Sequence, residues 1–453
     1  MSQHTAPRGP AGAGERALAP DLARGFMLLF IALANTVWYL WAVPMGSMSA
    51  HPEPEGAPDS VAQFFTIMAV DGRSYPMFAF LFGYGMVQLA RRQEAAGTAV
   101  KDVDALLRRR NLWLLVFGFV HALLLWMGDV LGAYGLVGLF LGWLFLRRRD
   151  TTLLVWAGVV TGLMVLLSAA SLVGLALMPA DQPAMSGSVM DDMAFNIGDP
   201  SLLGAVIGRV SVWPLIVLGQ GLLGLVVPMA ILLGYWAARR RVLEEPGRHL
   251  VLLRRTAVAG ISLGWLGGLP SALAQVGVWD LSAAQSGMLA LPHMVTGLAC
   301  GVGYVALIAL FSHRLQAGDR EPGVVVTALS ATGKRSLSAY LAQSVLCAPV
   351  LAAWGLGVGA YLSPWSMFLF AVGVWLTTVV GAYALERTGR RGPAEVLLRR
   401  LAYRRTGWEF AGGVPAPDAR TASPEAPEAL SEGLGGGPLT GPGEAKGQER
   451  TTP

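Results

Sequence analysis

Charged residues are scarce in this sequence, and their scarcity excludes an ordinary soluble protein. Asp, Glu, Lys and Arg make up 14% of the 453 residues, whereas a soluble domain carries about 25%. Hydrophobic residues account for 54% of the chain, and the mean hydropathy is +0.51. The sequence therefore predicts a protein whose outer surface faces lipid rather than water.

Cysteine is also nearly absent. The two cysteines, Cys300 and Cys347, both lie in apolar segments, so we expect small core residues rather than a disulfide framework. No Cys or His spacing resembles a zinc site, and no G-x-S-x-G nucleophile elbow is present. The sequence therefore predicts neither a metal centre nor a soluble hydrolase.

Two glycine motifs resemble nucleotide-binding loops but lie in the wrong context. GQGLLG at 219–224 fits the dinucleotide pattern, but it falls inside an apolar segment, where small residues favour close helix packing. GKRS at 333–336 lacks the upstream glycine of a phosphate loop, because Ala328 stands there, and Arg335 replaces the magnesium-binding Ser or Thr. We therefore expect a packing role for GQGLLG, and GKRS is not expected to be a phosphate loop.

Apolar residues are concentrated in ten segments, each close to the roughly 20 residues that a helix needs to cross a bilayer. One segment, 76–90, is shorter, but the amphipathic VAQFFTIMAV precedes it and extends it backwards. These segments predict an all-α fold, a polytopic membrane helix bundle of about ten transmembrane helices in a lipid bilayer. The expected spans are 25–43, 76–90, 112–126, 130–146, 153–178, 212–236, 257–276, 288–311, 337–356 and 365–385.

The distribution of Lys and Arg predicts the orientation of the bundle. With a cytoplasmic N-terminus, 32 of the 34 basic residues fall in cytoplasmic segments or at cytoplasmic helix ends, as the positive-inside rule requires. Only Arg73 and Arg209 fall elsewhere. Both termini are therefore expected in the cytoplasm, and the dispersed basic residues give no reason to expect a nucleic-acid partner.

The two ends of the chain differ in composition from its apolar body. Residues 1–20 and 407–453 are rich in Gly, Pro, Ala and Glu, a composition that cannot build a core. We expect disordered tails at 1–20 and 407–453, flanking a transmembrane helical domain at 21–406. No internal repeat is evident, which weakens an inverted-repeat transporter.

Two ionisable residues interrupt the apolar stretch FVHALLLWMGDVLGAYGLVG at 119–138. His121 falls in the outer half of one expected span, and Asp129 falls at the tight outer turn before the next. An ionisable group at membrane depth is costly unless it is paired or lines a wet cavity, so both are functional candidates. Two structural alternatives stay open: Asp129 as the N-cap of the following helix, and His121 as a neutral imidazole bonded to a neighbouring helix.

Other polar residues fall within or beside the spans, and we expect an outward-facing polar cavity where they converge. Asp71 with Arg73 is favoured as a local ion pair at the interface, and Gln343 as a helix–helix hydrogen bond. The remaining candidates are Asn35, Tyr134, His293 and Ser344.

Five blocks of sequence, in this order, resemble one protein family. They are Asp21-x-x-Arg24-Gly25 followed by Asn35; YPMFAFLFGYG at 75–85; H-A-x-x-x-W-x-G-D-V-L-x-x-Y from His121 to Tyr134; GKRSLSAYLAQS at 333–344; and RRGPAEVLLRRLAYRR at 390–405. Together they resemble the YeiB-like family, domain of unknown function 418, over residues 15–406. The resemblance implies a multi-pass protein of the bacterial inner (plasma) membrane.

That family looks distantly related to transmembrane acyltransferases, including the acyltransferase-three group and the heparan-glucosaminide acetyltransferases. In the first group an Arg is followed eleven positions later by a functional His, but here Arg24 is followed by Asn35, and an amide is no general base. In the second group an Asn is followed by a His. The nearest histidine after Asn35 is His51, and its spacing from Asn35 is longer than in that group. His121 is therefore the stronger candidate base.

The resemblance implies transfer of an acyl group from a cytoplasmic donor, such as acyl-CoA, to a small-molecule acceptor outside. Arg24 would bind the donor's phosphates, His121 oriented by Asp129 would accept a proton, and Asn35 would donate to the oxyanion. Substrate-binding candidates are Arg24, Arg73, Asp71, Tyr134, His293 and Gln343. The alternatives are a small-solute or proton-coupled transporter and a non-catalytic assembly or resistance role. The sequence leaves the oligomeric state open.

Overall fold

The computed structural model describes residues 17–46, 49–179, 196–318 and 322–403. The expected tail at 407–453 lies outside this described part, as do residues 1–16. The first helix, α1 (Leu18–Thr36), begins inside the range expected to be an N-terminal tail.

The described residues form helices and contain no β-strand, apart from one isolated bridge between Met45 and Pro52. The structure therefore confirms an all-α polytopic bundle. Within the described part of the chain, six helical segments are long and apolar enough to cross a membrane: Leu18–Tyr39, Asp150–Leu177, Leu202–Leu223, Pro246–Gln275, Ala283–Gln316 and Pro364–Arg387. Shorter apolar helices are Val130–Phe145 (α5), Val226–Arg239 (α9), Val324–Lys334 (α13) and Ser336–Leu351 (α14).

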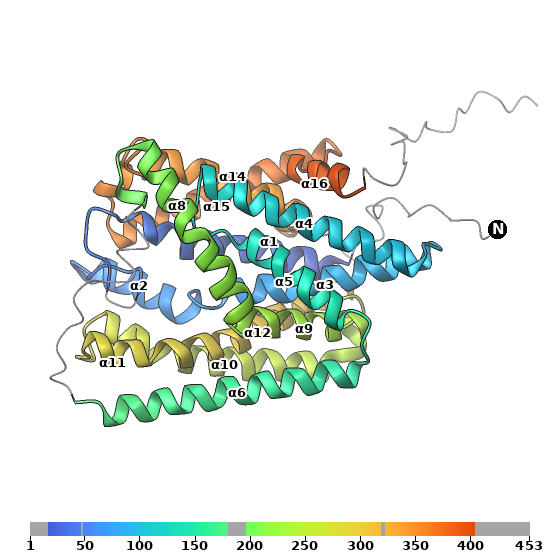
Figure 1. Cartoon of the computed structure of the whole chain (residues 1–453), viewed down its shortest axis with the longest axis horizontal. Helices are drawn as coiled ribbons and strands as arrows, with labels where there is room; N and C mark the ends of the chain where they lie inside the picture. Colours follow the sequence, from blue (N-terminus) through green and yellow to red (C-terminus); the bar gives the residue numbers. More distant parts are fainter. Residues whose placement is uncertain (1–16, 47–48, 180–195, 319–321, 404–453) are drawn as a thin grey trace, which may run out of the picture. The chain divides into compact units, whose positions relative to one another are not determined.

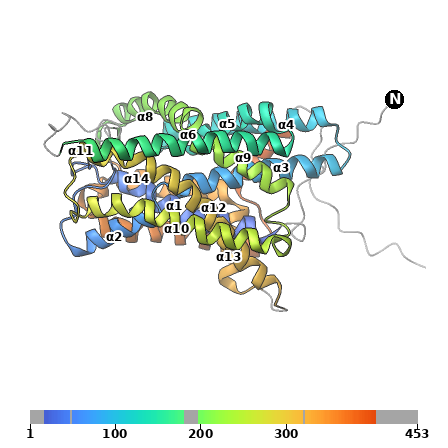
Figure 2. The same ribbon diagram turned by 90° about the horizontal axis from the view of Figure 1, so that it is seen from below.

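The helices run roughly side by side, and α1 lies among them. The longest are α3 (Ser74–Ala95), α4 (Val100–Leu124), α6 (Asp150–Leu177), α10 (Leu250–Gln275), α12 (Ala290–Gln316) and α15 (Pro364–Arg387) (Figure 1). Helix α1 contacts α3, α12, α13, α14 and α15, and Met27 and Leu28 within it are fully buried. In contrast, α6 runs along one face of the bundle in both views (Figure 2) and exposes apolar side chains such as Trp156 and Leu166.

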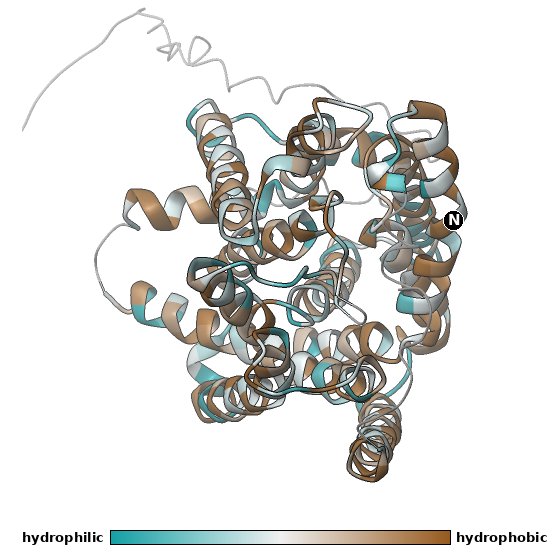
Figure 3. Cartoon of the chain, turned by 90° about the vertical axis from the view of Figure 1, so that its left-hand side faces the viewer, coloured by the Kyte–Doolittle hydropathy of each residue, from teal (hydrophilic) through white to brown (hydrophobic). Residues whose placement is uncertain are grey.

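Exposed apolar side chains are typical of a lipid-facing surface. Seen along the helices, hydrophobic residues dominate the ribbons (Figure 3).

The short helices are α2 (Ala57–Ala69), α8 (Leu202–Ile216), α11 (Ala283–Met288), α16 (Pro393–Tyr403), η2 (Val37–Tyr39), η4 (Pro246–His249) and η5 (Val358–Tyr361).

Two of the expected spans are broken rather than continuous. The span around 76–90 does extend backwards, but as a separate helix, because α2 ends at Ala69 and α3 begins at Ser74. The span expected at 212–236 comprises α8, a π-helix η3 (Val217–Leu223) and α9. Pro214 lies inside α8, and the chain leaves helical geometry at Gly224, as expected where proline and glycine interrupt the hydrogen-bond ladder. The GQGLLG motif is this π-helix and its end.

The GKRS motif at 333–336 joins two helices and ties them to α1 and α15. A Cβ at Gly333 would overlap the backbone carbonyl of Asp21 in α1, so only glycine permits this approach. Lys334 and Arg335 pair with Glu386 of α15 at 2.6 and 2.7 Å. In this structure the motif therefore serves helix packing and ion pairing.

Candidate functional site

His121 and Asp129 form a buried pair between the end of α4 and the start of α5. His121 Nδ1 lies 2.9 Å from Asp129 Oδ1, and the two side chains are 1% and 0% exposed. Asp129 is also the N-cap residue of α5, because its Oδ2 accepts a 2.6 Å hydrogen bond from Gly132 N. The carboxylate therefore both caps the helix and orients the imidazole, as capping geometry allows.

Ser344 of α14 completes a three-residue chain. Its Oγ lies 2.8 Å from His121 Nε2. Because an ionised carboxylate only accepts hydrogen bonds, Asp129 fixes the proton of a neutral His121 on Nδ1 and leaves Nε2 as the acceptor for the Ser344 hydroxyl. Tyr340, one turn earlier in α14, packs its ring 5.1 Å from the imidazole, and its hydroxyl accepts from Val130 N at 3.4 Å.

A small polar cavity adjoins Ser344. Its volume is about 20 Å³, which is room for one water molecule. Gln343 donates from Nε2 to Leu28 O at 3.1 Å, the helix–helix hydrogen bond expected for it, while its buried Oε1 has no partner among the described residues. The cavity is lined by Ala32, Asn35, Thr36, Tyr39, Trp126, Tyr340, Gln343, Ser344 and Cys347.

A much larger cavity, about 360 Å³ in volume, lies at the end of the bundle expected to be cytoplasmic. Basic side chains dominate its charged lining: Arg24, Arg92, Arg110, Lys334 and Arg399, against Asp21 and Glu395. Its apolar lining includes Phe78, Leu81, Phe82, Leu131 and Leu337. A cavity with this lining suits an anion that carries an apolar part.

Individual contacts set the character of this basic cavity. Arg24 pairs with Asp21 at 3.2 Å and donates to Leu81 O. Arg110 lies over the Phe82 ring, and its Nη1 has no partner among the described residues. On α16, burial raises the pKa of the Tyr403 phenol, which therefore lines the cavity as a neutral hydroxyl. Tyr134 borders the cavity and donates to Tyr75 O at 2.8 Å.

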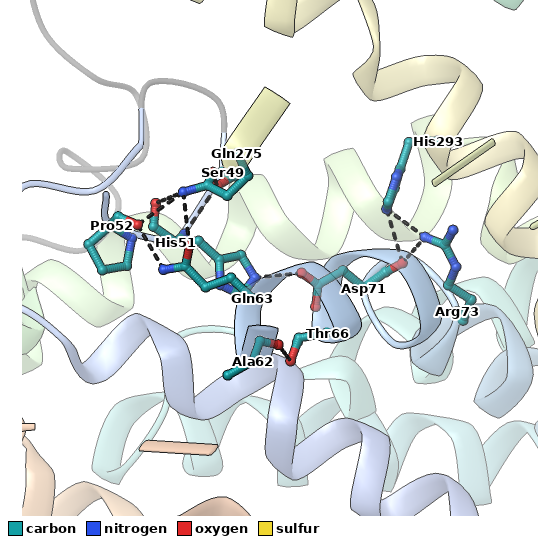
Figure 4. A network of polar contacts seen from close by, with 10 residues as sticks. All are labelled: Ser49, His51, Pro52, Ala62, Gln63, Thr66, Asp71, Arg73, Gln275 and His293. Atoms are coloured by element: carbon teal, nitrogen blue, oxygen red, sulfur yellow. Dashed lines mark hydrogen bonds and ion pairs between the residues drawn. The ribbon is translucent and has the colours of Figure 1, made fainter. Parts of the chain in front are cut away.

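A second polar cluster occupies the break between α2 and α3 (Figure 4). His51 Nε2 lies 2.7 Å from Asp71 Oδ2, and His51 Nδ1 is buried without a partner among the described residues. Arg73 donates from its guanidinium to Asp71 O, to His293 Nε2 at 2.6 Å and to Gly264 O at 2.6 Å. The expected Asp71–Arg73 ion pair is therefore absent from this cluster, since the Asp71 carboxylate faces His51.

The expected site residues thus fall into three places rather than one outward-facing cavity. His121 and Asp129 lie together, with Asn35 and Gln343 at the adjoining small cavity; Arg24 and Tyr134 line the basic cavity; His51, Asp71, Arg73 and His293 form the second cluster. Among the described residues, no group of three or more His, Cys, Asp or Glu side chains is arranged to hold a metal ion.

The sequence gives Ser344 as one of the polar candidates but predicts neither its contact with His121 nor the extent of the basic cavity. Ser344 is 223 positions from His121, so no local spacing links the two. The only sequence signal was the polar pair Gln343–Ser344 in an apolar helix. The sequence gives Arg92, Arg110 and Arg399 as basic residues at cytoplasmic helix ends, without indicating that they line one cavity with Arg24.

Comparison with known proteins finds relatives along most of the chain. The family described as "Protein of unknown function (DUF418)" matches residues 237–405. The chain is 28% identical over 417 residues to "Uncharacterized protein YxaH" of Bacillus subtilis (strain 168), which covers 87% of this chain and 96% of that protein. It is 26% identical over 417 residues to "Uncharacterized protein YeiB" of Escherichia coli (strain K12), covering 87% and 98%.

A shorter match is 34% identical over 132 residues to "Uncharacterized 39.9 kDa protein in amylase 3'region" of Bacillus acidopullulyticus, covering 29% of this chain and 35% of that protein. None of these names states an activity. The comparisons therefore show similarity to proteins whose names give no activity, and they lend no support of their own to the acyltransferase resemblance.

Proposed function

We propose that this chain, a membrane protein similar to YeiB and YxaH, transfers an acyl group across the bacterial plasma membrane. The donor is a cytoplasmic acyl thioester such as acyl-CoA, and the acceptor is a hydroxyl or amine at the extracytoplasmic face. The proposal combines the geometry of the site with the distant resemblance to transmembrane acyltransferases, which is an argument by analogy.

One observation carries the proposal: the first turns of α5 are shared by the basic cavity and the buried His121–Asp129 pair. Leu131 and Tyr134 line the cavity, while Asp129 orients His121 and Val130 N donates to Tyr340. Asp129 and Tyr134 are five residues apart, which is about 7.5 Å along a helix. A donor bound in the cavity would therefore bring its acyl end close to the imidazole.

The basic cavity has the chemistry that such a donor requires. Its guanidinium groups are suited to bidentate binding of phosphate oxygens, and Arg110 has an unpartnered Nη1 beside the cavity. The apolar side chains deeper in the cavity, among them Phe78 and Leu131, would pack against the pantetheine arm and the acyl group.

The buried pair of His121 and Asp129 supplies the reaction's acid–base chemistry. His121 accepts a proton at Nε2, and Asp129 stabilises the imidazolium that results. Asn35, which lines the small cavity beside Ser344, donates a hydrogen bond to the oxyanion that develops on the acyl carbonyl. Burial strengthens these interactions, since water is excluded around them.

The proposal is tested with the full chain purified into lipid nanodiscs. Radiolabelled acetyl-CoA and palmitoyl-CoA are supplied, and release of free CoA and transfer of label to extracted membrane lipids and glycans are measured. We expect release of CoA by the wild type, its loss in His121→Gln, and its retention in His249→Gln, a change at a cytoplasmic histidine outside the site. Absence of release by a folded wild type with either donor would overturn the proposal.

Transport of a small solute is a second candidate, favoured by the broken span α2/α3. Discontinuous helices with ionisable residues at the break recur in transporters. Here the break holds Asp71 and Arg73, which contact His51 and His293 respectively. Proton-driven accumulation of an unmodified solute in sealed vesicles, abolished by Asp71→Asn and unaffected by His121→Gln, would favour transport over transfer.

A further inference from the structure

The three-residue chain of Ser344, His121 and Asp129 has an orientation that a simple helix–helix hydrogen bond does not require. Asp129 uses one carboxylate oxygen for Gly132 N and the other for His121 Nδ1, at 2.6 and 2.9 Å. A neutral His121 is thereby fixed in the tautomer whose Nε2 lone pair accepts the Ser344 hydroxyl, 2.8 Å away. This is the relation between nucleophile, base and orienting acid that defines a serine triad, whatever the fold.

The surroundings of Ser344 indicate that a polar group binds beside it. Ser344 borders the 20 Å³ cavity together with Asn35 and Gln343. Gln343 is 5% exposed, and its Oε1 has no hydrogen-bond partner among the described residues. A buried acceptor without a partner is costly, so the cavity is built for a polar group rather than for apolar packing.

We infer that Ser344 is a nucleophile that carries the acyl group as an ester between donor and acceptor. The inference rests on the proposed acyl transfer and deepens it, because it divides the transfer into two half-reactions at one hydroxyl. The donor is an acyl thioester that enters from the basic cavity. Tyr340 lies between the two cavities, because it lines the small one and follows Leu337 of the basic one by one helical turn.

The first half-reaction loads the serine. The Ser344 hydroxyl proton moves to His121 Nε2 as Oγ attacks the thioester carbonyl carbon. The carbon–sulfur bond then breaks, sulfur leaves with the electron pair, and His121 returns the proton to it. The products are the Ser344 ester and a free thiol.

The second half-reaction unloads the serine. The acceptor hydroxyl gives its proton to His121 Nε2 while its oxygen attacks the ester carbonyl. The bond to Ser344 Oγ breaks, and His121 returns the proton to Oγ. Atoms and charge balance over the cycle, and no oxidant, reductant or metal is needed.

The experiment traps the ester on the purified full chain in nanodiscs. The protein is incubated with acetyl-CoA in the absence of acceptor, quenched in acid and digested, and the peptide that contains residue 344 is examined by mass spectrometry. We expect one acetyl group on Ser344 in the wild type, none in Ser344→Ala or His121→Ala, and wild-type labelling in Ser330→Ala, a change at another buried serine. Ser344→Ala should lower turnover by at least about 1000-fold.

A second variant guards against misfolding. Ser344→Cys keeps a nucleophile at nearly the same position, so it should form an acetyl thioester that neutral hydroxylamine cleaves. Two negative outcomes are distinguishable. Acyl transfer by the wild type with Ser344 unlabelled, and with folded Ser344→Ala within tenfold of wild type, overturns the nucleophile and leaves the proposed function standing. Neither CoA release nor labelling in the folded wild type overturns both.

Discussion

Gly118 and Asp129 lie against each other so closely that a side chain at Gly118 has no room. A Cβ built at Gly118 would overlap Asp129 Oδ2 and Gly132 N, the two atoms of the α5 N-cap hydrogen bond. The absence of a side chain in α4 therefore permits the carboxylate to reach both Gly132 N and His121. The position of the Asp129 carboxylate therefore depends on Gly118, which has no side chain.

Substitution of Gly118 should disturb the arrangement of Ser344, His121 and Asp129 without changing any of these three residues. We expect Gly118→Ala to force the start of α5 away from α4, to lower stability by about 1–3 kcal/mol, as overpacking does, and to reduce turnover. Thermal unfolding in detergent and CoA release measure the two effects. The control is Gly158→Ala in α6, where a Cβ would meet nothing within 4 Å. Equal behaviour of the two variants would contradict the close fit.

The basic cavity makes a prediction about donor affinity. Arg110→Gln removes a cation whose Nη1 has no partner among the described residues. We therefore expect the substitution to lower the affinity for the bound ligand. A hydrogen bond to a charged group contributes about 1.5–3 kcal/mol, so CoA affinity should fall at least about tenfold. The affinity of the variant for CoA should also depend less on salt concentration than that of the wild type. Calorimetric titration with CoA measures both.

The matched control for this prediction is Arg148→Gln. Arg148 is an exposed residue of the same end of the bundle and does not line the cavity. If this control weakened CoA binding as much as Arg110→Gln, general surface charge rather than the cavity would account for the affinity.

Local sequence predicted the pairing of His121 with Asp129, because the tight turn from α4 to α5 brings residues eight positions apart together. It could not predict the contact with Ser344, which comes from α14, 223 positions further along the chain. The Asp71–Arg73 pair was favoured from proximity in sequence, but the break between α2 and α3 points the carboxylate at His51 instead. In both cases tertiary packing selected the partner.

The two arginines that did not fit the charge distribution also have structural explanations. Arg209 donates to Ala122 O and Leu123 O at the end of α4, carbonyls that the helix itself leaves unpaired. Arg73 donates to Gly264 O, a carbonyl inside α10. Apolar length predicts that a span exists around 212–236, but it carries no information about the π-helix and the break at Gly224, which follow Pro214 in the chain.

The predicted orientation is tested by cysteine accessibility. In a background with Cys300 and Cys347, both buried, replaced by alanine, a cysteine at Asp280 should react with an impermeant maleimide in intact cells. A cysteine at Arg248 should react only after the membrane is permeabilised, because the positive-inside rule assigns that end to the cytoplasm. Both positions are exposed in the structure. Labelling of the Arg248 position in intact cells would contradict the orientation.

The two roles of Asp129 are separable by a single isosteric change. Asn is as good an N-cap as Asp, so Asp129→Asn should still accept from Gly132 N and keep the unfolding temperature near that of the wild type. The variant loses the negative charge that stabilises the His121 imidazolium, so turnover should fall by roughly 100-fold or more, within the range that acid–base catalysis contributes. His121→Gln keeps a hydrogen-bonding side chain but removes the base, and it should be at least as inactive while remaining folded. Purely structural roles give a different pattern, in which both variants keep wild-type CoA release or lose activity only as far as they lose stability. Measuring unfolding temperature and CoA release on the same preparations of both variants therefore decides whether this buried pair performs chemistry or only holds α4, α5 and α14 together.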